Sequence, residues 1–293
     1  MADDRVFDRT ADDIGNIVEF GHVNVRVPDQ HLATLFYVTG LGLTRDPYLV
    51  TGVENMWINV GTTQFHLPTG PAQVLRGTTV ISVPDMAGLA RRLAVVARHL
   101  EGSKFSFGET SAGIEVTCPW GNRIRCVPAT SIRLAITEVE LDCPLGGAAG
   151  IARFYRDIYG TPAAVEHGAA VVPAGLYTRL VWRETDAALP AYDGAHIQIG
   201  LADFSGPHRK LNALGLISEE SNQHQYRMLD ITDLDTGRVL ATLEHEVRSM
   251  RHPMYARPLI NRDPAISNNL YALGREPLVL GADLVAMGGS SFL

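Results

Sequence analysis

Cysteine is scarce in this chain of 293 residues, and its scarcity limits what the protein can be. Only Cys118, Cys126 and Cys143 are present, and their spacing contains no C-x-x-C pair. A secreted disulfide scaffold uses a denser, even-numbered set of cysteines, and a zinc ribbon uses closely spaced pairs. We therefore expect three small buried thiols in a reducing compartment.

Long apolar runs and an excess of basic residues are also missing. No apolar stretch reaches the roughly 18 residues that a membrane-spanning helix needs. The 25 Lys and Arg residues are scattered and are outnumbered by 32 Asp and Glu, which excludes the basic patch of a nucleic-acid-binding protein. The first residues, Met1 to Asp8, are acidic and polar, unlike a signal peptide. These features predict a cytoplasmic protein with neither nucleic-acid nor membrane partners.

The chain does contain an internal repeat. A short alternating strand recurs four times, and the residues near its start are His22, Thr78, Glu138 and His196. Each strand is followed by a helical pattern and then by further β runs, so each unit is expected to be a βαβββ module. Alternating strands that carry helices on one face leave the opposite face free to curl around a cavity. The strand openings lie at 21–29, 78–85, 137–144 and 196–203.

The repeat predicts an α+β fold in which four βαβββ modules are paired into two cup-shaped halves with mixed sheets. Residues 1–16 are expected to be a flexible lead. Neighbouring modules are expected to pair, so that residues 17–130 form the first half and residues 131–249 the second. A tail, 250–293, contains prolines that interrupt long elements, and we expect it to wrap the surface or contact another subunit.

Four motifs follow one another along the chain: Gly21-His22-Val23-Asn24-Val25, Val60-Gly61 with Gln64-Phe65-His66-Leu67, Pro119-Trp120-Gly121-Asn122-Arg123-Ile124, and Tyr192-Asp193-Gly194-Ala195-His196. In this order they resemble the vicinal oxygen chelate superfamily, which contains glyoxalase I, bleomycin resistance proteins and extradiol dioxygenases. The resemblance implies a small-molecule substrate and a divalent metal ion (Fe, Mn, Ni or Zn) held by the first and last strands of paired modules. The number of modules, four, is similar to that of the extradiol dioxygenases.

In the first predicted half, the resemblance places His22 and His66 at metal-ligand positions. Thr78 and Arg125 fall at the other two positions, where threonine is a poor ligand and arginine cannot ligate. Arg125 is instead a candidate for binding a carboxylate or phosphate of the substrate, or a salt-bridged strand residue. This half therefore provides a second candidate metal site with only two imidazoles, and Gln64 is a candidate to assist them.

In the second predicted half, the resemblance gives His196, Glu138 and Glu244 as the metal ligands. This set is rich in carboxylates and is similar to that of glyoxalase, and Glu138 or Glu244 would also act as the general base. Strand alternation places Ala241 and Glu244 on opposite faces of the sheet, so the register of the last strand decides which residue faces the metal.

Two residues after the last predicted strand, Arg248 and Tyr255, are candidates for binding an anionic or phenolic substrate. The resemblance thus leaves three functions open. The protein is expected to be a metal-dependent enzyme, either an extradiol-type dioxygenase or a glyoxalase-like lyase or isomerase. The alternative is a metal-free protein that sequesters a drug or metabolite. A homo-oligomer is a further expectation, because modules pair between chains in this superfamily.

Overall fold

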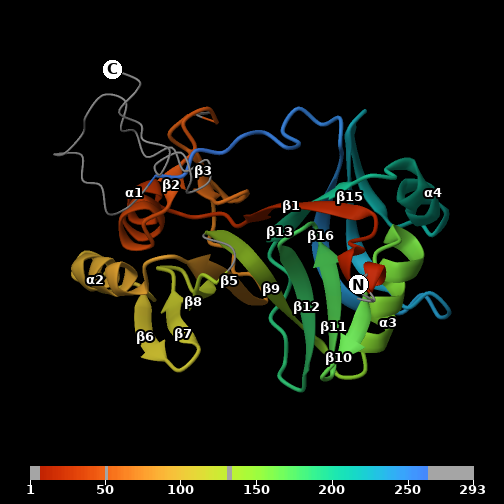
Figure 1. The fold of residues 1–293 in the computed structure, drawn as a ribbon, viewed down its shortest axis with the longest axis horizontal. Coiled ribbons are helices and arrows are strands. Elements are labelled where there is room, and N and C mark those ends of the chain that lie inside the picture. Colours follow the sequence, from red (N-terminus) through yellow and green to blue (C-terminus); the bar gives the residue numbers. More distant parts are fainter. Residues whose placement is uncertain (1–6, 50–51, 131–133, 263–293) are drawn as a thin grey trace, which may run out of the picture.

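Two mixed β-sheets, each with eight strands, form the body of the molecule (Figure 1). The computed structural model describes residues 7–49, 52–130 and 134–262. Within these residues the four predicted βαβββ modules are present, and the predicted fold class is confirmed. The predicted lead contains a short 3₁₀ turn, η1 (Arg9–Asp12), whose first residues are capped by the Asp8 carboxylate.

The first sheet joins the first module to the fourth. Its two central strands, β1 and β13, run antiparallel, with His22 opposite Gln198 and Asn24 opposite His196. In order across the sheet, the strands are β14 (Ile217–Asn222), β15 (Gln225–Thr232), β16 (Val239–Ser249), β13 (His196–Leu201), β1 (Ile17–Asn24), β4 (Thr63–Pro68), β3 (Asn55–Val60) and β2 (Thr44–Arg45).

The second sheet joins the second module to the third. Its central strands, β5 and β9, are also antiparallel, with Thr78 opposite Glu140 and Val80 opposite Glu138. In order across the sheet, the strands are β10 (Ala164–Glu166), β11 (Ala169–Ala174), β12 (Thr178–Thr185), β9 (Ala135–Pro144), β5 (Gly77–Val83), β8 (Arg123–Pro128), β7 (Gly113–Thr117) and β6 (Ser106–Thr110).

This pairing corrects the predicted division of the chain into halves 17–130 and 131–249. Neighbouring modules one and two do not share a sheet, because the first strand of module one pairs with that of module four. The alternating pattern of a strand determines which of its faces is apolar, but it does not select which strand lies beside it. Tertiary packing decides which first strands pair, and this pairing brings together residues that the sequence prediction had assigned to different sites.

Two of the predicted strand openings end in a Pro-Asp pair, Pro28-Asp29 and Pro84-Asp85, and a helix begins directly after each. The carboxylate of Asp29 accepts hydrogen bonds from the backbone N–H groups of His31 and Leu32, and Asp85 caps the second helix through Gly88. The Pro-Asp pairs of the repeat are therefore helix caps. The helices are α1 (Gln30–Ala33), which continues as the π-helix η2 (Thr34–Gly40), α2 (Met86–Ala97), α3 (Ala148–Phe154), which continues as the π-helix η3 (Tyr155–Tyr159), and α4 (Ser205–Ala213).

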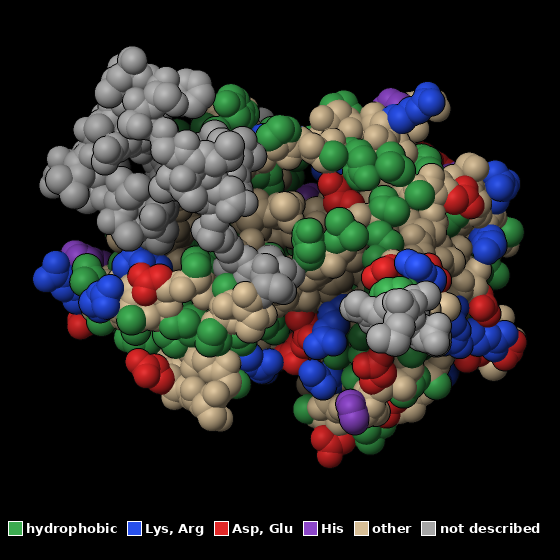
Figure 2. Space-filling view, viewed as in Figure 1, with side chains coloured by type: hydrophobic (Ala, Val, Ile, Leu, Met, Phe, Trp, Pro, Cys, Tyr) green, Lys and Arg blue, Asp and Glu red, His purple; other side chains and the backbone are tan. Residues whose placement is uncertain are grey.

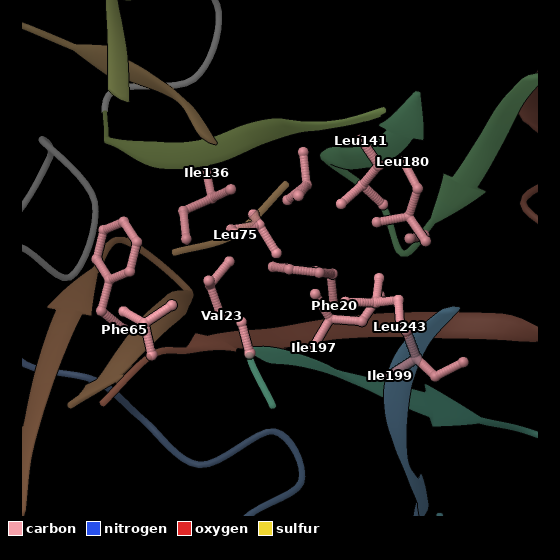
Figure 3. Packing of buried hydrophobic residues seen from close by; sticks show 14 of the residues in the cluster. Phe20, Val23, Phe65, Leu75, Ile136, Leu141, Leu180, Ile197, Ile199 and Leu243 are labelled. Atoms are coloured by element: carbon pink, nitrogen blue, oxygen red, sulfur yellow. The ribbon is translucent and has the colours of Figure 1, made fainter. Parts of the chain in front are cut away.

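The core lies between the two sheets (Figure 3). Val23 and Ile197 of the first sheet point toward Ile136 and Leu180 of the second, and all four side chains are buried. Each such side chain stabilises the fold by about 1.5–3 kcal/mol through removal from water. Because side chains alternate along a strand, burying Val23 on the inner face turns its neighbour His22 to the opposite face of the sheet.

A further described segment follows β16. Residues 250–262, which we call the strap, leave the end of β16 and pass above β1 toward β2 and β3 (Figure 1). The strap belongs to the predicted tail 250–293, whose remaining residues, from 263 onward, lie outside the described residues. Asn261 of the strap donates to the backbone oxygen of Gly61 and accepts from the Gly61 N–H, at 2.8 and 2.9 Å. The strap thereby ties module four to module one.

The cysteines and the surface agree with the composition. Cys118, Cys126 and Cys143 are buried and form no disulfide, which confirms the prediction of free buried thiols. Acidic and basic side chains are interspersed over the visible face of the molecule (Figure 2). In the described part of the chain, no helix is both long and apolar enough to cross a membrane.

Candidate metal centre

The two histidines that open modules one and four lie next to each other. His22 on β1 and His196 on β13 occupy neighbouring antiparallel strands two register positions apart, and their ring centroids are 5.9 Å apart. The last strand of module four, β16, runs parallel to β13 and places Glu246 opposite Gln198. These residues share the face of the first sheet that is opposite the core.

His22, His196 and Glu246 form a group that fits a metal ion. One ligand atom from each residue lies within 4.8 Å of the others, and all three residues are buried. Both His22 Nε2 and His196 Nε2 are buried without a hydrogen-bond partner. An orphaned imidazole nitrogen is unfavourable in a protein interior unless it has a ligand, so these two atoms are the strongest sign of a missing partner.

Both imidazoles are neutral. Burial lowers the pKa of His22 well below its ordinary value, and the positive charge of Arg248 lowers it further. Burial, followed by the charge of Arg227, lowers the pKa of His196 to about 3. A neutral imidazole keeps a lone pair free at physiological pH, which is the form that binds a metal ion.

Glu246 is the carboxylate that the sequence reasoning did not select. Arg227 Nη2 donates to Glu246 Oε2 at 2.8 Å, and Arg248 Nη2 lies 2.5 Å from Oε1 without the geometry of a hydrogen bond. The only sequence signal for Glu246 was its place two residues after Glu244, on the same face of the same strand. The parallel register between β13 and β16 determined which of the two carboxylates joins the histidines.

Glu244, predicted as a ligand and as a general base, lies just outside the group. Its Oε1 atom is 3.5 Å from His196 Nδ1, and it accepts a hydrogen bond from Arg227. A carboxylate on the second nitrogen of a metal-binding histidine orients the ring and favours one tautomer. Glu244 is thus placed to orient His196 while the orphaned Nε2 of His196 faces the group.

His66, the predicted partner of His22, lies beside the group with both ring nitrogens occupied. Its ring stacks on Trp57, with centroids 3.8 Å apart and an interplanar angle of 12°. The Asn24 amide nitrogen approaches Nδ1 at 2.5 Å, and Nε2 lies 2.6 Å from Asn55 Oδ1. His66 therefore buttresses His22, and its ring centroid lies 5.6 Å from that of His22.

Glu138 and Arg125 lie in the second sheet, so the prediction that Glu138 shares a site with His196 is wrong. Arg179 Nε donates to Glu138 Oε2 at 2.6 Å, and Arg125 forms ion pairs with Glu115 at 2.6 Å and Glu140 at 3.2 Å. The cup of the second sheet is occupied by these charge pairs. Arg125 is a salt-bridged strand residue, and its predicted role in binding substrate is not supported by its position.

A cavity of about 630 Å³ opens beside the centre. His22, Gln198 and Arg248 line one side of it, and the strap, including Tyr255, lines another. Two predicted substrate-binding residues, Arg248 and Tyr255, are thus brought to the same cavity as His22. The remaining wall comes from the turn between β11 and β12 in the second sheet, where Leu176 and Tyr177 are largely exposed. Both sheets therefore contribute to one cavity.

Paired βαβββ modules in two mixed sheets are consistent with the glyoxalase fold. Solved structures similar to this chain include glyoxalase I from Zea mays, with a TM-score of 0.54 and 13% identity over 79% of this chain and 92% of that chain. A "putative dioxygenase" from Bacillus subtilis has a TM-score of 0.53 and 14% identity over 82% of this chain and 87% of that one. Neither a family model nor a curated protein matches the sequence.

Proposed function

We propose that the protein is a metal-dependent dioxygenase of the extradiol type that acts on a small oxygenated aromatic molecule. The observation that carries this proposal is the convergence of His22, His196 and Glu246 within 4.8 Å, with both imidazole Nε2 atoms lacking partners. Two histidines and one carboxylate with open positions are the donor set of non-haem Fe(II) oxygenases. The carboxylate-rich set expected for a glyoxalase-like lyase is not assembled, because Glu138 lies in the second sheet.

His22, His196 and Glu246 would hold the metal ion. Such an ion supplies a Lewis acid and a binding position for dioxygen when it is bound. The chain itself supplies neutral ligands, because burial keeps both imidazoles unprotonated. It also supplies positive charge beside the centre, from Arg227 and Arg248, which favours a substrate that carries a negative charge on oxygen.

The cavity suits a molecule with one ring. Its volume of about 630 Å³ is within the range of small-molecule sites. Arg248, which is buried, provides a polar anchor on the side of His22, while Leu176 and Tyr177 provide an apolar wall. A substrate with a polar edge and an apolar body would be oriented with its polar edge toward the centre.

Metal analysis of protein purified without chelator tests the proposal. Stoichiometric iron is expected in the wild-type protein, and it should be lost in His196→Ala and in His22→Ala. The exposed histidine His31 provides a matched control, so His31→Ala should retain the metal. Oxygen uptake with catechols by the iron-loaded wild type would then support the dioxygenase. Iron that resists both ligand substitutions would show that the centre has been misplaced.

One observation favours the second candidate, a metal-free binding protein. Glu246 is already engaged by Arg227 and Arg248, so its negative charge is compensated without a cation. This second function would be preferred if the wild-type protein binds catechol but no divalent metal with measurable affinity. In that case His196→Ala should leave the binding of catechol unchanged.

A further inference from the structure

Gln64 lies directly opposite His22 in the parallel pairing of β1 and β4. Its side chain is buried and lines the same cavity as His22. The orientation of this carboxamide decides whether the cavity meets a hydrogen-bond donor or an acceptor beside the metal centre. The neighbouring hydrogen bonds fix that orientation.

The orientation begins at the strap. The backbone oxygen of Ile260 can only accept, and it accepts from Asn59 Nδ2 at 2.8 Å. The amide of Asn59 is thereby fixed with its Oδ1 atom turned the other way, and this oxygen accepts from Gln64 Nε2 at 2.7 Å. A second acceptor, Asp46 Oδ2, lies 3.0 Å from the same nitrogen. Gln64 Nε2 therefore faces two oxygen acceptors, and both of its protons are used.

Asp46 is held as an acceptor by its own partners. Burial acts to raise the pKa of this carboxyl group, but hydrogen bonds from Arg257 and from the backbone N–H groups of Leu49 and Tyr48 bring it below the ordinary value. Arg257 Nη2 donates to Asp46 Oδ2 at 2.5 Å. Arg257 and Ile260 both belong to the strap. Docking of the strap therefore decides which groups donate and which accept in this series of hydrogen bonds.

The remaining polar atom of Gln64 is its carbonyl oxygen, Oε1, which accepts no hydrogen bond from any residue in the described ranges. We propose that the strap fixes Gln64 with this oxygen presented to the cavity as an acceptor beside His22, so that the site selects a substrate with a hydroxyl group at that position. This inference rests on the proposed function for the chemical class of the substrate, a hydroxylated aromatic ring. Gln64 is then a specificity-determining residue, and Asp46 and Asn59 are positioning residues.

A binding experiment on metal-free protein tests this role without any activity readout. Catechol and 2-fluorophenol have nearly the same shape, but 2-fluorophenol lacks one hydroxyl donor. The ratio of their dissociation constants, measured by calorimetry, reports the contribution of an acceptor. The wild type should prefer catechol by about fivefold, since one hydrogen bond from a neutral hydroxyl contributes on the order of 1 kcal/mol.

Three variants separate an acceptor from a merely structural residue. Gln64→Met removes the acceptor and should abolish the preference for catechol. Gln64→Glu disturbs the hydrogen bonds to Asp46 and Asn59 as strongly as Gln64→Met does, but it keeps an acceptor oxygen. It should therefore retain the preference for catechol. Gln223→Met makes the same substitution at an exposed glutamine outside the cavity and should leave the ratio unchanged. Circular dichroism checks that each variant is folded.

The inference is overturned if wild-type protein shows no preference, or if folded Gln64→Met keeps it. If Gln64→Met does not fold, Asp46→Asn provides the second test. It replaces an obligate acceptor by an amide that can also donate, so the Gln64 amide is freed to turn and the preference should fall. An unchanged ratio in folded Asp46→Asn overturns the inference as well. Because metal content is measured separately, a loss of the proposed metal centre and a loss of the Gln64 acceptor give different results.

Discussion

His22 and His196 belong to the first and the fourth modules, yet their rings lie with centroids 5.9 Å apart at the centre of one sheet. Neither module supplies all the groups of the centre by itself. The carboxylate comes from β16, and the buttressing histidine, His66, comes from β4. The centre therefore exists only when modules one and four are paired.

The two carboxylates of β16 should differ in their effect on metal binding. Glu246→Gln removes a proposed ligand and is expected to lose stoichiometric metal, whereas Glu244→Gln removes a group that only orients His196 and should weaken affinity by about 10–100-fold. Competition with a chromophoric chelator measures both affinities. The opposite ranking would return Glu244 to the role of ligand.

The stability of metal-free protein should depend on pH through its buried histidines. Burial lowers the pKa of His66 and His196 to about 3 and that of His245 to about 4, whereas the ordinary value is 6.5. Below pH 6.5 the unfolded chain therefore binds more protons than the folded one. Stability is fully present above that pH and falls as the pH drops toward 3–4, by about 1.4 kcal/mol per pH unit for each histidine. Urea unfolding between pH 7.5 and 5.5 measures the slope, and a flat profile would contradict neutral buried imidazoles.

Breaking the ion pair between Arg257 of the strap and Asp46, the residue that follows β2, should destabilise the fold. Asp46 is buried, and Arg257→Met removes the cation that pairs with it. A buried carboxylate left without its cation costs about 3 kcal/mol, measured as the free energy of unfolding in urea. Arg153→Met provides a control, because its pair with Asp235 is exposed and its loss should leave that free energy nearly unchanged. Equal effects of the two variants would show that the strap is not anchored by this pair.

The glycine of the Gly21-His22 motif should be required by packing. A Cβ atom added at Gly21 would lie 1.6 Å from Gln198 Oε1, and Gln198 is itself buried. Gly21→Ala therefore has to displace Gln198 from the cavity wall next to His22. We expect a loss of about 1–3 kcal/mol of unfolding free energy from this overpacking.

Gly108 on β6 is the matched control for that substitution. A Cβ atom there meets nothing within 4 Å, and the backbone is not in the left-handed region. Gly108→Ala should thus leave the protein as stable as the wild type or slightly more so. A Gly21→Ala variant with wild-type stability would mean that Gln198 moves aside freely.

The local signals in the sequence identified the modules well. The recurring alternating strands, with the helical pattern and the β runs that follow each of them, predicted four βαβββ units, and the structure contains them. His22 and His196 were also singled out as metal-ligand candidates, and Arg248 and Tyr255 as substrate-binding candidates. The two histidines were assigned to different halves of the chain, and the structure brings them together. The prediction of the modules succeeded because the periodicity of strands and helices depends on residues close together in the chain.

The partners of those residues were decided only by the tertiary structure. Strand pairing joined modules one and four, which united His22 with His196 and left Glu138 and Arg125 among charge pairs in the second sheet. The register between β13 and β16 then selected Glu246, and docking of the strap oriented Gln64. Apolar periodicity specifies the buried face of a strand, but the choice and register of its neighbour depend on the packing of side chains distant in sequence.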